Sequence, residues 1–230
     1  MGALLNRRRY MGGGGSIVLP IPYISDGLVA AWDGEYNTGT SHDGNASNWV
    51  DCVGGLTLAG VNSPGWGDKY ALFDRLSSMY FSGTGTDISN VFRQNYVEVV
   101  VELSTSLPNL YRIRAFDTNS HELCFHSSQG IKIATATNNS FKVATKGVLL
   151  SYHIDYSTWS LWENGSALSP TGTNSEPNSG GYTIGASYWR GNYRDYFDGK
   201  IYCVRMYNRE LTATEIAYNY SIDLQRFGTT

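Results

Sequence analysis

Residues 199–216 read GKIYCVRMYNRELTATEI, a segment in which a strand pattern passes directly into a helix pattern. Its first half is rich in Tyr, Ile and Val, which favour an extended strand. Thr212 and Glu215 stand at the spacing of a capping box, in which each side chain accepts a hydrogen bond from the backbone N–H of the other residue. We therefore predict a closing strand followed by an amphipathic helix. The residues expected on one face of that helix are Ile216, Tyr220 and Leu224.

Earlier in the chain, short apolar segments alternate with turn residues. Residues 97–103 carry an apolar side chain at every second position, which is the period of a strand with one buried face. Asn164-Gly165 is a strong signal for a type I′ hairpin. Many short strands with frequent turns predict an all-β fold, built as a two-sheet antiparallel sandwich. The segments predicted as strands are residues 28–32, 71–73, 79–81, 97–103, 110–116, 122–126, 131–135, 141–145, 148–155 and 159–163.

Five segments, in this order along the chain, resemble motifs of laminin G-like domains of the concanavalin A-type lectin family. They are residues 28–34 (LVAAWDG), 49–55 (WVDCVGG), 161–165 (LWENG), 182–185 (YTIG) and 197–216. The last follows the family's closing pattern almost position by position, whereas Glu163 stands where an apolar residue is commoner. The resemblance implies a jelly-roll sandwich over residues 23–230, closed by the short C-terminal helix, and sugar binding as the usual function.

The N-terminal residues 1–22 differ in composition from the rest of the chain. A basic stretch precedes Gly12–Gly15, which has the composition of a flexible linker. This order is similar to the start of bacteriophage structural proteins, and domains of the resembled family occur in phage virions. The similarity implies an extended arm that docks on other virion proteins, a virion location, and a homo-oligomer. The expected anchoring residues are Arg7, Arg8, Arg9 and Tyr10.

Composition excludes several classes of function. A net charge of −3 leaves no basic footprint for nucleic acid. We expect no membrane association, because no apolar run reaches the length of a span. The charges follow a very short apolar stretch at the N-terminus, which is the reverse of a secretory signal peptide, so we expect synthesis in a bacterial host's cytoplasm. Cys52, Cys124 and Cys203 are too widely spaced for a zinc site and are expected to be free thiols.

The residues before the closing strand form the strongest candidate contact surface. Residues 187–196 are expected to be a loop and contain four aromatic and two arginine side chains. Exposed aromatic rings can stack on sugars, but the same composition fits a protein–protein hot spot or a cap on the end of the sandwich. All three alternatives stay open from the sequence. The candidate contact residues are Tyr188, Trp189, Arg190, Asn192, Tyr193 and Arg194.

Calcium is the only cofactor for which the sequence offers a candidate site. Residues 41–48 form a polar segment, and Asp43 and Asn45 are its candidate ligands, with Asp33 or Asp51 as further charged donors. Calcium needs six to eight oxygen ligands, so this set is short of charge. Asp and Asn in such a segment also serve as simple turn residues.

No catalytic set stands out. Glycoside hydrolases of the resembled fold carry the string E-x-D-x-E, which this chain lacks. Glu98 and Glu102 lie roughly 13 Å apart along a strand, too far for a catalytic pair, and are expected to be solvated. His121 and His126 are expected on opposite faces of a strand, which excludes a zinc-protease motif. We therefore predict a non-enzymatic virion protein, a capsid decoration or a head or tail fibre component. The alternatives are an adhesion module for a host surface glycan and, less favoured, a glycoside hydrolase.

Overall fold

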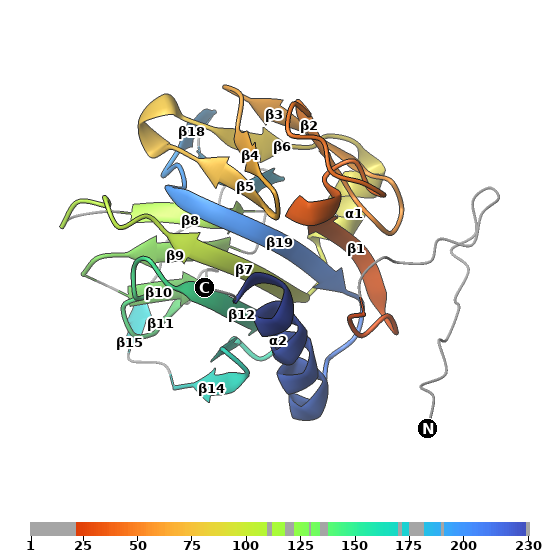
Figure 1. Ribbon diagram of the computed structural model, residues 1–230. Helices are drawn as coiled ribbons and strands as arrows, with labels where there is room; N and C mark the ends of the chain where they lie inside the picture. Colours follow the sequence, from red (N-terminus) through yellow and green to blue (C-terminus); the bar gives the residue numbers. More distant parts are fainter. Residues whose placement is uncertain are drawn as a thin grey trace.

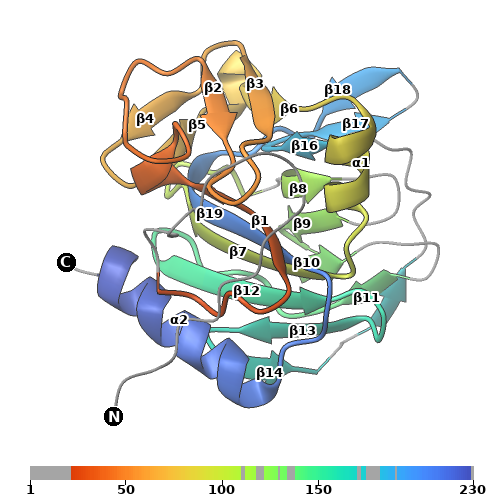
Figure 2. The same ribbon diagram turned by 90° about the vertical axis from the view of Figure 1, so that its right-hand side faces the viewer.

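The strand pattern at residues 97–103 forms β7 (Tyr96–Leu103), which lies inside an eight-stranded antiparallel sheet. A nine-stranded antiparallel sheet packs against this sheet (Figures 1 and 2). The computed structural model describes residues 22–109, 112–117, 122–128, 130–133, 138–169, 172–174, 182–189 and 191–228. The predicted two-sheet sandwich is therefore confirmed. The predicted arm residues Arg7, Arg8, Arg9 and Tyr10 lie outside the described residues, as do Arg190 and His121.

The eight-stranded sheet has the order β14-β13-β12-β7-β19-β5-β4, and β1 pairs with β19 beside β5. Its other strands are β1 (Leu28–Asp33), β4 (Gly65–Gly67), β5 (Tyr70–Phe73), β12 (Leu149–Asp155), β13 (Ser160–Glu163), β14 (Ser166–Leu168) and β19 (Gly199–Tyr207). Asn164 and Gly165 have φ angles of 52° and 73° between β13 and β14, which confirms the predicted hairpin.

The nine-stranded sheet has the order β15-β11-β10-β9-β8-β16-β6-β3-β2. Its strands are β2 (Asn48–Val50), β3 (Thr57–Val61), β6 (Tyr80–Ser82), β8 (Arg112–Asp117), β9 (Glu122–His126), β10 (Gly130–Ile133), β11 (Asn138–Ser140), β15 (Gly172–Asn174) and β16 (Thr183–Ile184). The prediction of a strand at 141–145 is wrong. Phe141 donates its N–H to the carbonyl of Ile131, and the carbonyl of Lys142 accepts the N–H of Ile131, but residues 141–145 form no strand, and the paired register ends at Ser140.

Four helices and one hairpin complete the part of the fold that the structure describes. They are η1 (Gly34–Tyr36), η2 (Arg75–Ser77), α1 (Thr86–Phe92), α2 (Ala213–Phe227) and the hairpin of β17 (Ser187–Trp189) and β18 (Asn192–Arg194). No helix within the described ranges is long and apolar enough to cross a membrane.

One main core lies between the sheets, and the period-2 pattern explains it. Val97, Val99, Val101 and Leu103 of β7 all point into this core and are fully buried. Each such side chain contributes about 1.5–3 kcal/mol by leaving water. The three cysteines are buried and free, as predicted.

The helix α2 packs on the outer face of the eight-stranded sheet (Figure 2). Its start confirms the predicted capping box: the Thr212 side chain accepts from Glu215 N–H, and Glu215 accepts from Thr212 N–H at 2.8 Å. Its predicted apolar face is partly wrong, because Leu224 is exposed. Asn219 and Asp223 are buried instead, since the sheet beneath them carries charged side chains.

The charged cluster beneath α2 centres on Arg205 of β19. Its Nε donates to Glu98 at 2.8 Å, and its two terminal nitrogens donate to Asp223 at 2.7 and 2.9 Å. Burial raises the pKa of Glu98. The charge of Arg205 and the side-chain hydrogen bonds that Glu98 accepts outweigh burial and leave this pKa below its usual value. The prediction that Glu98 is solvated is therefore wrong, because α2 covers it.

The same helix holds the first described residues of the chain. Tyr23 donates its hydroxyl to Asp223 at 2.7 Å, and the N–H of Ile24 donates to Asn219 at 3.0 Å. The hydroxyl of Tyr218 donates to the carbonyl of Pro22 at 3.1 Å. The beginning of the sandwich and its last helix therefore form one contact region.

Candidate functional site

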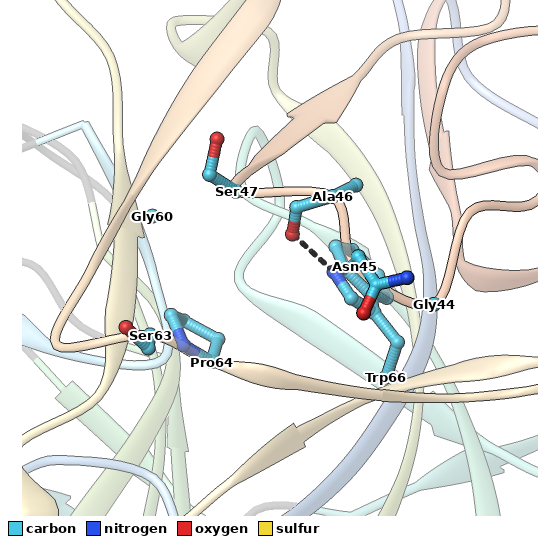
Figure 3. Close-up of a pocket in the computed structure, with 8 residues that line it drawn as sticks. All are labelled: Gly44, Asn45, Ala46, Ser47, Gly60, Ser63, Pro64 and Trp66. Carbon is cyan, nitrogen blue, oxygen red and sulfur yellow. Dashed lines mark hydrogen bonds between the residues drawn. The ribbon is translucent and has the colours of Figure 1, made fainter.

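A pocket of about 260 Å³, here called the rim pocket, opens at the edge of the sandwich. One wall is the segment before β2, and the other is the connection from β3 to β4, which passes from the nine-stranded to the eight-stranded sheet. In Figure 1 these strands lie at the top of the molecule. The lining residues, drawn in Figure 3, are Gly44, Asn45, Ala46, Ser47, Gly60, Ser63, Pro64 and Trp66.

Trp66 of β4 forms the aromatic wall of the rim pocket, and the core holds it in place. Its ring packs edge-on against Trp49 and tilts against Phe81, with centroid distances of 5.4 Å in both pairs. Its indole N–H donates to the carbonyl of Ala46 at 2.7 Å, the dashed line in Figure 3. Because an indole has one donor and no acceptor, Trp66 can offer a ligand only its ring surface.

The backbone around the rim pocket is closely fitted. Gly60 donates its N–H to the carbonyl of Ser47 at 2.9 Å, and a Cβ at Gly60 would stand 2.4 Å from that oxygen. Asn62 and Ser63 follow in the left-handed region, with φ of 56° and 55°. A non-glycine residue costs free energy in this conformation, so the surrounding structure holds the backbone at Ser63 against a local preference.

The polar side chains of the rim pocket are Asn45, Ser47 and Ser63. All three are exposed, and their amide and hydroxyl groups make no hydrogen bond within the described part of the chain. None of the eight lining residues carries a charge. The pocket therefore combines a fixed ring surface with neutral groups that can both donate and accept hydrogen bonds.

The predicted contact loop is a hairpin rather than a loop, because β17 and β18 pair along their length. Tyr188 faces Tyr193, and Trp189 faces Asn192. The rings of Tyr188 and Tyr193 lie 4.9 Å apart, and Tyr193 stacks on Tyr80 at 4.3 Å. Tyr193 thus contacts two other rings of the protein and still has 37% of its surface exposed.

The predicted contact residues are brought together only in part. Asn192 and Arg194 lie on β18 beside Tyr193, and Arg194 pairs with Asp195 at 3.7 Å. The backbone of Trp189 lies in β17, whereas its side chain and the whole of Arg190 lie outside the described residues. A binding role for these residues stays a prediction.

Two buried side chains of β8 hold the hairpin on the nine-stranded sheet. Asp117 accepts the N–H of Tyr188 at 2.9 Å, and the Arg114 guanidinium pairs with Asp195 at 2.8 Å. Burial raises the pKa of Asp117 to about 7, against the opposing effect of Arg114 and together with the repulsion from Glu122. Asp117 is therefore a carboxyl group that changes charge near neutral pH.

Asp117 and Glu122 also form a carboxylate pair that sequence reasoning missed. They face each other across β8 and β9, and Arg114 forms an ion pair with Glu122. Both carboxyl groups are buried. Glu98 pairs with Arg205, and Glu102 accepts from Lys200 and from Tyr202.

The candidate calcium ligands are used in local contacts. The carboxylate of Asp43 accepts the N–H of Asn45 at 2.9 Å, and its backbone bonds in both directions with the Asn37 side chain. Asp33 is paired with Arg226, and Asp51 accepts three backbone N–H groups. Among the described residues, no group of three or more His, Cys, Asp or Glu side chains is placed to hold a metal ion. Calcium binding by Asp43 and Asn45 stays a prediction.

The rim pocket carried only a weak signal in the sequence. Residues 62–65 read NSPG, a turn composition directly before Trp66. A turn followed by a lone tryptophan indicates neither a pocket nor its second wall, which comes from residues 44–47, two strands earlier in the chain.

Residues 92–217 match the sequence profile of the concanavalin A-like lectin/glucanases superfamily. No curated protein sequence matches the chain. The fold is similar to a mutant Trypanosoma rangeli sialidase displaying trans-sialidase activity, with a TM-score of 0.60 and 15% identity over 94% of this chain and 35% of that one.

Two toxin structures are also similar. One is a structure of botulinum neurotoxin type C, a toxin whose cell entry depends on interaction with two ganglioside molecules. Its TM-score is 0.57 and its identity to this chain is 9%. The other is the binding domain of botulinum neurotoxin DC in complex with rat synaptotagmin II, with a TM-score of 0.57 and 10% identity. Each match covers 85% of this chain and 51% of the toxin chain. The chain thus spans about a third of the sialidase and half of the toxin chains, and at these identities the similarity shows the fold.

Proposed function

The chain belongs to the concanavalin A-like lectin/glucanase superfamily, and from this premise we propose that it is a non-enzymatic carbohydrate-binding module whose sugar site is the rim pocket. Membership confirms the resemblance seen in the sequence. It leaves the ligand and the site to be argued from the residues of this chain.

The observation that carries the proposal is the composition of the rim pocket. Trp66 presents a ring surface whose only polar group is already bonded to Ala46. Asn45, Ser47 and Ser63 surround this surface with unused hydrogen-bonding groups. Sugars have apolar C–H faces and hydroxyl edges, so a ring surface bordered by amide and hydroxyl groups matches both parts of such a ligand.

The structural neighbours support the class of ligand. Another structure of the T. rangeli sialidase, which is also similar to this chain, was solved in complex with sialic acid, and cell entry of the type C neurotoxin depends on two ganglioside molecules. Both of those ligands are carbohydrates or carry them, although each observation concerns the other protein. The binding to synaptotagmin II by the neurotoxin DC domain favours keeping protein contact as an outcome of the test.

A glycan array probed with the full chain tests the proposal. We expect selective binding, and about a tenfold loss of affinity in the double variant Asn45→Ala/Ser47→Ala, because two neutral hydrogen bonds are each worth about 0.5–1.5 kcal/mol. The matched control is Leu76→Ser, which changes a side chain that is 78% exposed and outside the pocket.

Three results would contradict the proposal. Uniform failure to bind glycans would exclude carbohydrate binding. If Tyr193→Ala loses binding while Asn45→Ala/Ser47→Ala still binds as the wild type does, the site lies on the hairpin and not in the rim pocket. Release of new reducing ends from a bound polysaccharide would contradict the non-enzymatic assignment.

A structural role in a virus particle is a second candidate function, favoured by the basic and glycine-rich residues 1–22. In this role the arm attaches the protein to other virion proteins, and the sandwich is displayed. Deleting residues 2–16 is expected to leave the circular dichroism of the sandwich unchanged and to abolish incorporation into the assembly. Unchanged incorporation would overturn the role of the arm.

A further inference from the structure

The rim pocket has features that go beyond a general affinity for carbohydrate. We infer, resting on the proposed function, that it takes one uncharged sugar ring and discriminates against sugars that carry a carboxylate. The inference depends on the charge around the pocket, the volume of the pocket and the chemistry of its three polar side chains.

The electrostatics of the pocket are unfavourable for an anion. None of its lining residues is charged, and Asp43 directly precedes the lining segment with an exposed carboxylate. The cations nearest along the chain are engaged elsewhere: Lys69 donates to the carbonyl of Arg226, and Arg75 pairs with Asp198. A bound carboxylate would lose water without gaining a cationic partner, which is unfavourable.

The volume of the pocket limits the ligand to a small unit. Sites for drug-sized ligands have volumes of about 300–1,000 Å³. The rim pocket, at about 260 Å³, lies below this range. The spacing of its two walls is set at one point, because Gly60 donates its N–H to the carbonyl of Ser47 and no side chain fits between them. A single ring, such as the terminal residue of a glycan, is the unit that such a pocket can surround.

The polar side chains suit hydroxyl groups rather than a charged group. Ser47 and Ser63 each offer a hydroxyl that donates and accepts, and Asn45 offers an amide that does both. A sugar hydroxyl has the same dual character, so each contact can be made in either direction. A carboxylate only accepts and prefers charged donors such as Arg or Lys. The ligand inferred for this pocket therefore differs from sialic acid, the acidic sugar in the T. rangeli sialidase structure.

Matched pairs of sugars test this inference on the full chain. The methyl glycosides of glucose, galactose and mannose are compared by calorimetry or ligand-observed NMR with the methyl glycosides of the corresponding uronic acids, which differ only at C6. Sialic acid is a further acidic probe. We expect at least one neutral glycoside to bind, and its uronic acid to bind at least tenfold more weakly.

Two variants locate the source of the discrimination. Asp43→Asn removes the neighbouring carboxylate. We expect it to reduce several-fold the ratio of the affinity for the neutral glycoside to the affinity for its uronic acid. Asn45→Lys places a cation at the pocket mouth and is expected to raise the affinity for the uronic acid at least fivefold.

The outcomes separate this inference from the proposed function. Equal or tighter binding of an acidic sugar, lost in Asn45→Ala/Ser47→Ala, would overturn the inference and leave the proposed function standing. If the ratio of the two affinities is the same in Asp43→Asn, in Asn45→Lys and in the wild type, charge is not the source of the discrimination, and the inference is overturned. Binding of no sugar in any arm would overturn the proposed function, and the inference with it.

Discussion

Asp117 links the stability of the protein to pH, because its carboxyl group is buried and has a pKa of about 7. The unfolded chain releases this proton near pH 4. Between pH 4 and 7 the folded state therefore binds more protons than the unfolded state, so stability falls as pH rises and levels off above pH 7. The difference between the pKa values of the folded and unfolded states corresponds to an effect on the order of 4 kcal/mol.

Replacing Asp117 with Asn removes this titration and keeps an acceptor for the N–H of Tyr188. We expect the variant to match the wild type near pH 4 and to be about 2–4 kcal/mol more stable at pH 7.5. Urea unfolding at both pH values measures the difference, with Asp68→Asn, at an exposed aspartate, as the control. Parallel stability curves for wild type and Asp117→Asn would contradict the assignment.

At the scale of elements, the attachment of α2 to the eight-stranded sheet depends on Arg205. The guanidinium is almost fully buried between Glu98 and Asp223, and it lies 3.7 Å from the centroid of the Tyr23 ring. Arg205→Met would leave two carboxylates without their cation. We expect a loss of about 3–5 kcal/mol in the free energy of unfolding, measured by urea denaturation.

Two further variants separate this electrostatic effect from lost packing. The triple variant Arg205→Met/Glu98→Gln/Asp223→Asn removes the stranded charges and is expected to recover more than half of the loss. Arg209→Met breaks a partly exposed pair with Glu215 and is expected to lose about 1 kcal/mol or less. A triple variant no more stable than Arg205→Met would assign the effect to packing.

At the scale of the whole molecule, the sequence predicts those features that depend only on residues close to one another along the chain. The alternation at 97–103 predicted β7, and Thr212 with Glu215 predicted the start of α2, because strand period and helix capping act within a few residues. The order of five short motifs predicted the sandwich and its family.

Features that join distant residues escaped prediction. Glu98 meets Arg205 across 107 positions, so the sequence pattern placed Glu98 in solvent. The same cluster makes α2 bury Asp223 and expose Leu224, against its apolar period. The two walls of the rim pocket are joined by the hydrogen bond from Trp66 to Ala46, twenty positions earlier, and no local pattern encodes that contact.

The contact between α2 and residues 22–24 has a mechanical consequence. Pro22 and Tyr23 are bonded to the helix that ends the described chain, so a tether at either end would pull on the same region of the domain. In both ribbon views α2 lies in the lower half of the molecule, and the strands around the rim pocket lie at the top (Figures 1 and 2). Such a tether would load α2 and residues 22–24 rather than the strands around the rim pocket.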